Sequence, residues 1–366
     1  MSILIKSAKI IDASSKFNGK TKDIFIKQGI IQEIADNIIK KSAKEIKLDN
    51  LHVSQGWLDS SVSFGEPGLE ERETIENGSL TACLSGFTDI ILNSNTLPVI
   101  DSKADVIYVK SKNKNKALKI HPLGALTLRS EGSEMAELHE MFDSGAVGFY
   151  DYKKSVKNPN LLKTALQYVQ HFDGLIMTFP YEKSICANGQ MNEGEISTLY
   201  GLEGIPSLSE EIILERDLKI LEYTGGKLFI PTISTSKSVE LIKNAKRKGL
   251  QIMTSVSINN IFFNEKKLIN FDTRFKVLPP LRSEEDRLIL VNALSEGIID
   301  FCTSDHFPID IDNKKTDFKN SLFGATGLES IFGALNSLYK TEKVIEILTR
   351  KKDLFGIKNE VIDLGS

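Results

Sequence analysis

From residue 54 onward, short apolar runs alternate with longer amphipathic stretches, and this alternation limits the possible folds more than any other feature of the chain. The apolar runs predict buried strands at 88–92, 146–150, 174–177, 227–230, 250–253 and 298–302. The amphipathic stretches predict helices at 71–86, 159–171, 208–224, 236–248, 283–295 and 327–338. Such alternation is typical of an α/β protein whose parallel sheet closes into a TIM-type (β/α)8 barrel, with its chemistry at the carboxyl ends of the strands.

The segment before the barrel has a different rhythm. Short β-forming runs at 3–5, 9–11 and 23–26 are separated by turn residues, and Gly29 precedes a further run at 30–34. This pattern predicts a small β module over residues 2–53. The Gly-rich motifs of nucleotide-binding loops are absent from the sequence, so a dinucleotide or P-loop site is not expected.

Composition excludes several classes of partner. The 366 residues carry 46 basic and 49 acidic side chains, a net charge of −3, so neither nucleic acid nor a membrane surface is expected as the main partner. Cys83, Cys186 and Cys302 lie far apart, as expected for free thiols in a reducing compartment, and no histidine is placed to activate Cys186. With neither a signal-peptide pattern nor an apolar stretch of about 18 residues, we expect a cytoplasmic protein.

A series of motifs, ordered along the chain, carries a resemblance to a known family. They are Glu66-Pro67-Gly68, Asn95-Thr96, Met191-Asn192-Glu193-Gly194, Gly201-Leu202-Glu203-Gly204-Ile205-Pro206, Pro279-Pro280-Leu281-Arg282 and Gly324-Ala325-Thr326-Gly327-Leu328-Glu329. In this order and spacing they resemble the dihydroorotases of the longer bacterial type, members of the amidohydrolase superfamily. The resemblance implies an amidohydrolase-type barrel over 54–356. It also implies a small β-sandwich-like domain built mainly from 1–53 and completed by 357–366.

The resemblance also indicates where the family binds metal. Active members hold two zinc ions with four histidines and acidic ligands. At the four histidine positions this chain has Ser61, Ser63, Phe179 and Thr232. Hydroxyl and phenyl groups do not replace imidazole as zinc ligands, so we expect no metal cofactor.

Acidic side chains persist at two of the family's site positions. Asp151 lies near the place of a bridging ligand, and Asp305 matches an aspartate that serves as ligand and general base in the family. Asp59 persists as well. The resemblance leaves Asp305 as either a relic or an active base, and a weak Mg²⁺ or Ca²⁺ site on Asp151 and Asp305 is an alternative.

The family's substrate contacts are also altered. Gly65 stands where the resemblance implies an arginine that binds a carboxylate, Leu278 replaces an asparagine and Ile309 replaces a histidine. Asn95 and His306 remain as candidate ligand contacts. Each has a structural alternative, Asn95 in a turn and His306 as a buried hydrogen-bonding group.

Three interpretations of function remain open. The one we favour is a catalytically inactive dihydroorotase-like protein of pyrimidine biosynthesis, a pseudoenzyme that acts as a structural or regulatory partner. The resemblance suggests aspartate transcarbamoylase as that partner, because metal-free relatives assemble with it, and we also expect a homo-oligomer. The second is a dihydroorotase-like or hydantoinase-like cyclic-amide hydrolase with an altered metal site. The third is a small-molecule sensor that uses the old pocket.

Overall fold

The computed structural model describes residues 2–115 and 117–366 and divides by its contacts into two units. The barrel unit is Leu58–Tyr339, and the small unit combines Met1–Trp57 with Lys340–Ser366. The boundaries expected at residues 53 and 356 remain predictions, but the contacts place helix α13 (Thr341–Thr349) in the small unit. No helix of the described residues is long and apolar enough to cross a membrane.

Two sheets of the barrel unit are joined by bridges into a ring, and a separate two-stranded sheet pairs β11 (Met191–Asn192) with β12 (Gly204–Ile205). Of the two sheets in the ring, one has the order β6-β7-β8 and the other β15-β14-β13-β10-β9. Their bounds are β6 Trp57–Val62, β7 Phe87–Leu92, β8 Lys119–Pro122, β9 Phe149–Tyr150, β10 Leu175–Met177, β13 Lys227–Ile230, β14 Ile252–Ser257 and β15 Phe301–Thr303. Parallel bridges from Gly124 to Phe149 and from Val62 to His306 close the ring, and the expected α/β barrel is confirmed.

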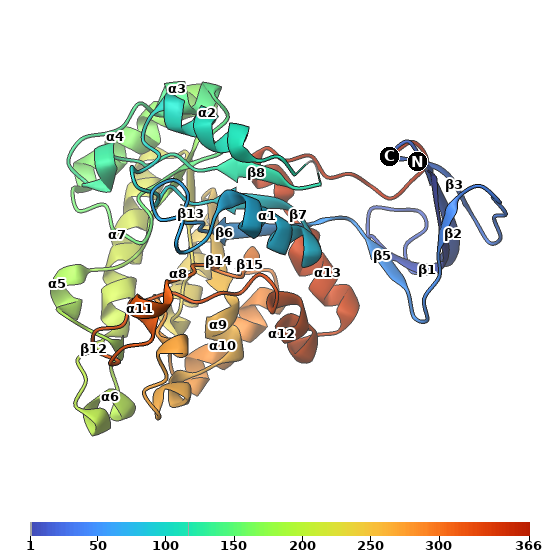
Figure 1. The fold of residues 1–366 in the computed structure, drawn as a ribbon. Coiled ribbons are helices and arrows are strands. Elements are labelled where there is room, and N and C mark those ends of the chain that lie inside the picture. Colours follow the sequence, from blue (N-terminus) through green and yellow to red (C-terminus); the bar gives the residue numbers. More distant parts are fainter. Residues whose placement is uncertain (1, 116) are drawn as a thin grey trace. The chain divides into compact units, whose positions relative to one another are not determined.

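Helices surround these strands in Figure 1. They are α1 Ile75–Leu84, α2 Lys103–Lys112, α3 Leu138–Asp143, α4 Pro159–Val169, α5 Lys183–Cys186, α6 Glu195–Tyr200, α7 Ser207–Thr224, α8 Ser236–Arg247, α9 Ile258–Phe262, α10 Glu284–Ser295, α11 Ile311–Lys314 and α12 Ile331–Leu338. The helix expected from residue 71 begins at Ile75, because the Thr74 side chain accepts a hydrogen bond from the Asn77 N–H and caps it. The helix expected from 327 begins at Ile331.

The barrel core consists of the apolar strand residues that the sequence predicts. Ile90, Ile91 and Leu92 of β7 are fully buried, as are Leu228 and Phe229 of β13. Both faces of these strands are covered, which is why they read as continuous apolar runs instead of alternating ones. This core fixes the strand ends that carry the polar side chains described below.

The small unit contains one five-stranded sheet. Its strands are β1 Ser2–Ile11, β2 Thr21–Lys27, β3 Ile30–Ala35, β4 Lys44–Ile46 and β5 His52–Ser54, in the order β3-β2-β1-β4, with β5 paired to β1. Strands β2 and β3 form a hairpin through Gln28 and Gly29, which both have positive φ, as a two-residue turn of this kind requires. The N-terminal β domain is therefore confirmed.

The C-terminal segment contributes to this sheet's core. Ile362 packs with Ile10 and Ile24 in a buried apolar cluster. The N–H of Ile362 donates to Asp12 Oδ2 at 2.8 Å, and the N–H of Ile31 donates to the Ser366 carbonyl at 2.8 Å. These contacts support the proposal that the C-terminal residues complete the small unit.

Candidate functional site at the strand ends

The predicted site residues lie at the carboxyl ends of the barrel strands. Ser61 is one of the last two residues of β6 and Ser63 follows that strand, Asn95 follows β7, and Asp305 and His306 follow β15. The Val62–His306 bridge brings the ends of β6 and β15 together. The fold therefore gathers in one place residues that lie up to about 245 positions apart in the sequence.

The two serines are held by an asparagine that sequence reasoning missed. The amide nitrogen of Asn93 donates to Ser61 Oγ at 3.1 Å and to Ser63 Oγ at 3.0 Å. The Ser63 hydroxyl in turn donates to Asn95 Oδ1 at 3.0 Å. Ser61, Ser63 and Asn93 are all buried, so the two hydroxyls belong to a buried polar network, in which Asn93 Oδ1 has no hydrogen-bond partner among the described residues. The cluster Asn93-Ser94-Asn95 after a strand was the available signal.

Asp59 joins strands β6 and β15. Its carboxylate accepts hydrogen bonds from the Ser61 N–H at 3.1 Å, from the Ser304 N–H at 3.0 Å and from the Thr303 hydroxyl. The side chain is fully buried, and burial raises its pKa despite these donors. A carboxylate with this set of donors holds the barrel closed, which gives Asp59 a structural role.

Asp305 forms a buried ion pair with Lys153. The Lys153 Nζ lies 2.8 Å from Asp305 Oδ2, and the two side chains are 10% and 3% exposed. Burial raises the pKa of Asp305, while the Lys153 ammonium acts to lower it. The other oxygen, Oδ1, is buried with no hydrogen-bond partner among the described residues. Lys153 has a positive φ of 52°, and nothing in the sequence pattern marked it as a site residue.

His306 is fixed by contacts on both ring nitrogens. The Gly327 N–H donates to Nδ1 at 3.2 Å, so Nδ1 accepts and the proton of the neutral ring lies on Nε2. Nε2 lies 2.7 Å from Glu73 Oε2, and both side chains are buried. The Phe64 ring packs edge to face against the imidazole, with 6.3 Å between the two ring centroids. This geometry is that of a structural histidine, and its partner Glu73 was not expected from the sequence.

Both carboxylate oxygens of Asp151 already accept hydrogen bonds from the loop after β8. Oδ1 accepts from the N–H groups of Leu126 at 2.9 Å and Thr127 at 3.0 Å, and Oδ2 accepts from the Thr127 hydroxyl. Burial raises the pKa of Asp151. The carboxylate therefore positions the loop after β8.

Phe179 and Thr232 complete the four positions at which the resemblance implies histidine. Phe179 is buried after β10, and its ring lies 5.9 Å from that of Tyr181. Thr232 has a φ of 50°, and its N–H donates to Ser255 Oγ at 3.0 Å. Neither side chain offers a nitrogen or sulfur donor.

The side chains present do not fit a pair of zinc ions. Asp305 is paired with an ammonium group, both Asp151 oxygens already accept hydrogen bonds, and Ser61 and Ser63 are engaged with Asn93. Within residues 2–115 and 117–366, no group of three or more His, Cys, Asp or Glu side chains lies close enough together to hold an ion. Zinc sites need nitrogen, sulfur or carboxylate donors that are available for coordination.

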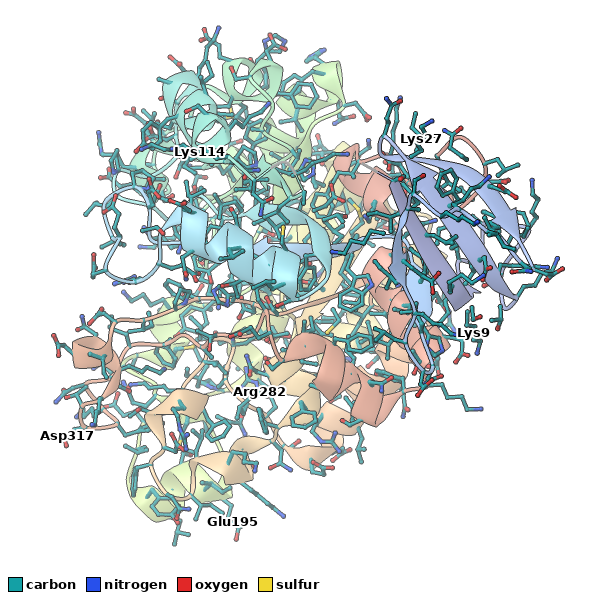
Figure 2. All side chains as sticks on the ribbon, turned by 45° about the vertical axis from the view of Figure 1, so that its right-hand side comes forward. Lys9, Lys27, Lys114, Glu195, Arg282 and Asp317 are labelled. Atoms are coloured by element: carbon teal, nitrogen blue, oxygen red, sulfur yellow. The ribbon has the colours of Figure 1, made fainter. Side chains whose placement is uncertain are left out.

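The motifs that resemble the family converge instead on one buried arginine. Arg282 donates to Asn192 Oδ1 at 2.8 Å, to the Ile205 carbonyl at 2.6 Å and to Ser234 Oγ at 3.0 Å. Glu210 accepts from the Ser234 N–H at 2.8 Å and lies 4.0 Å from the guanidinium. Figure 2 shows Arg282 among the barrel elements, whereas Glu195 and Asp317 lie at the edge of the view. The motifs around residues 192, 205 and 282 thus form a framework for the loops.

The cysteines show no catalytic arrangement in the described part of the chain. None of the three forms a disulfide in the described residues. Cys186 is buried, with its sulfur 2.9 Å from Ser209 Oγ, and Cys83 lies 3.1 Å from Asn115 Nδ2. Burial raises the pKa of the Cys83 thiol, which disfavours the reactive thiolate.

Comparison with known proteins agrees with the motifs. A family model described as dihydro-orotase-like matches residues 52–238. A dihydroorotase of Caldanaerobacter subterraneus subsp. tengcongensis is 36% identical over 92% of this chain and 78% of the relative. A dihydroorotase of Pelotomaculum thermopropionicum is 32% identical over 100% of this chain and 87% of the relative.

Similarity to solved structures supports the fold. An L-hydantoinase from Arthrobacter aurescens superposes with a TM-score of 0.82 over 97% of this chain and 82% of that chain, at 21% identity. A D-hydantoinase from a Thermus species superposes with a TM-score of 0.80 over 100% of this chain and 84% of that chain, at 20% identity. The family model and the relatives at more than 30% identity show that the chain belongs to the dihydroorotase-like family.

Proposed function

We propose that this chain is a non-catalytic member of its family, a pseudoenzyme that serves pyrimidine biosynthesis as a structural or regulatory partner. The observation that carries the proposal is the Lys153–Asp305 ion pair. It places a positive charge on the carboxylate at the strand end that the family uses for metal. A cation would have to displace this ammonium and would then meet hydroxyl and phenyl groups at the four histidine positions.

The chemical argument concerns the nucleophile. Opening a cyclic amide at neutral pH needs a strong nucleophile, and metals supply it by lowering the pKa of bound water towards about 7. Because the described side chains at the strand ends do not fit zinc, they do not supply a metal-bound water for this step. Turnover of dihydroorotate should therefore be absent with added Zn²⁺, Co²⁺, Mn²⁺ or Mg²⁺. Turnover that rises with any of these ions would refute the proposal.

The partner that we propose is aspartate transcarbamoylase of the same organism. The barrel and its loop framework are retained although the site is altered. This is expected if selection preserves a surface that contacts a partner. Co-expression and size-exclusion chromatography should give a complex of the two chains. If the two proteins elute separately at micromolar concentrations, this partner is wrong, while the non-catalytic assignment stands. The mass of this chain alone, from light scattering, tests the proposed homo-oligomer.

One observation favours a second candidate, a hydrolase without the usual metal site. Asp305 Oδ1 is buried and has no partner among the described residues, so it could accept a proton. If dihydroorotate, hydantoin or allantoin is hydrolysed, Asp305→Asn should abolish the activity. No hydrolysis of any of the three would exclude this candidate.

A further inference from the structure

A lysine-rich pocket lies beside the Lys153–Asp305 pair. It has a volume of about 410 Å³ and is formed by the segments 130–132, 151–157 and 181–183. Its lining includes Lys153, Lys154, Lys157, Lys183, Ser155 and Tyr181. The volume is within the range of small-molecule sites, which runs from about 300 to 1,000 Å³.

The positive charge of this pocket is only partly balanced. Lys153 is paired with Asp305. Lys154 donates to the Ser130 carbonyl at 3.0 Å, a neutral acceptor, and no salt bridge in the described residues involves Lys154, Lys157 or Lys183. These three lysines therefore make no short ion pair in the described residues, although Lys154 acts at longer range on Glu131 and Lys157 on Glu182.

The nearby carboxylates are otherwise engaged. Glu131 pairs with the Arg129 guanidinium at 2.9 Å, and Arg129 holds the pKa of Glu131 below its usual value. Asp151 accepts hydrogen bonds from the Leu126 and Thr127 donors described above. Glu182 Oε1 accepts from the Ser184 N–H at 3.0 Å and from its hydroxyl. Four lysines line the pocket with only two carboxylates, those of Glu131 and Asp151, so positive side chains outnumber negative ones in its lining.

We propose that this pocket binds a small molecule that bears a phosphate group. Lysines bind phosphate as point charges. A phosphate group carries a charge of about −1.5 to −2 at pH 7 and has three strong acceptor oxygens, so several ammonium groups can bind it at once. The Ser155 hydroxyl can add a donor, and the half-buried Tyr181 ring offers an apolar wall for the rest of the molecule. The proposal requires no metal and no turnover, so it stands independently of the proposed function.

The test is calorimetric titration of the full chain at constant ionic strength. The probes are pyrophosphate and inorganic phosphate, with succinate as a dicarboxylate of similar size and sodium chloride as the ionic control. We expect pyrophosphate to bind at one site per chain and at least ten times more tightly than succinate. The variant Lys157→Gln/Lys183→Gln removes two exposed ammonium groups and should weaken pyrophosphate at least tenfold.

The matched control is Lys41→Gln/Lys47→Gln, which changes the net charge equally at exposed positions of the small unit. It should bind pyrophosphate as the wild type does. Equal weakening in both variants would show unspecific attraction to net charge and overturn the proposal. Succinate binding as tight as pyrophosphate would overturn the phosphate class, and no binding of either probe would overturn the site. Circular dichroism of each variant establishes that it is folded.

Discussion

The Nζ of Lys153 lies 2.8 Å from Oδ2 of Asp305, and the side chains of both residues are almost fully buried. The pair joins the loop after β9 to the end of β15, across 152 residues of sequence. The Lys153 ammonium also lies 5.2 Å from the centre of the Tyr152 ring and 5.9 Å from that of Phe307. The Lys153 side chain thus places a positive charge of the protein itself beside Asp305 at the carboxyl end of β15.

Removal of the lysine from this pair should destabilise the protein. Lys153→Met leaves Asp305 buried without its partner, and breaking a buried pair in this way costs about 3–5 kcal/mol. Urea unfolding measures the change in free energy. Lys154→Met removes a neighbouring, exposed ammonium and should cost less than about 1 kcal/mol.

A second variant separates the charge from the packing. In Lys153→Met/Asp305→Asn the unpaired carboxylate is gone, so part of the lost stability should return. Asparagine also tolerates the positive φ of position 305. A double variant no more stable than Lys153→Met would mean that the charge of Asp305 is not the cause.

Arg282, which is buried and hydrogen-bonded, should contribute more to stability than an arginine in an exposed ion pair. Arg282→Met leaves the acceptors of Asn192, Ile205 and Ser234 buried without their donor, and we expect a loss of about 3 kcal/mol or more. The control is Arg274→Met, because Arg274 pairs with Asp272 while its side chain is 80% exposed. That change should stay within about 1 kcal/mol. Equal losses would contradict the framework role of Arg282.

Lys276 should make stability depend on pH in the alkaline range. Its Nζ donates to the Phe318 carbonyl at 2.6 Å and to the Lys319 carbonyl at 3.3 Å, and burial lowers its pKa to about 8. Between about pH 8 and the unfolded value near 10.5, the unfolded chain binds more protons than the folded one. Stability contributed by this site therefore rises with pH across that window.

The comparison of wild type with Lys276→Met tests this effect. The difference in unfolding free energy should be constant below about pH 8 and should then shift in favour of the wild type up to about pH 10.5. Burial and the Lys276 ammonium together lower the pKa of neighbouring Lys314 to about 8, so Lys276→Met also removes the part of that shift that Lys276 causes, which changes the difference in the same direction. A difference that does not vary with pH would show that Lys276 keeps an ordinary pKa.

The C-terminal segment should matter for the stability of the small unit. Ile362→Ala removes a side chain that packs against Ile10 and Ile24, and a buried isoleucine to alanine change costs about 2–5 kcal/mol. Leu364→Ala is the control, because Leu364 is 55% exposed. Hydrogen exchange of β1 and β2 amides measures the effect locally. Equal exchange in both variants would contradict the proposal that this segment completes the sheet.

The barrel could be predicted from the sequence because its signal is local. The apolar run 227–230, for example, coincides with β13. The ordered motifs indicated the family. The partners at the strand ends could not be predicted, because they come from distant segments. Glu73 meets His306 across 233 residues, and the positive φ that directs Lys153 towards Asp305 has no sequence signature in a lysine. The site residues Asn95, Asp305 and His306 stay predictions as functional groups.

Metal content tests the central claim most directly. Elemental analysis of the purified protein after dialysis against zinc, with Lys153→Met measured beside it, reports whether the strand ends hold an ion. The account predicts less than about 0.1 zinc per wild-type chain, because Lys153 occupies Asp305 and no imidazole stands at positions 61, 63, 179 or 232. One or two zinc ions per wild-type chain would contradict it and would show that ligands other than those expected assemble at the barrel.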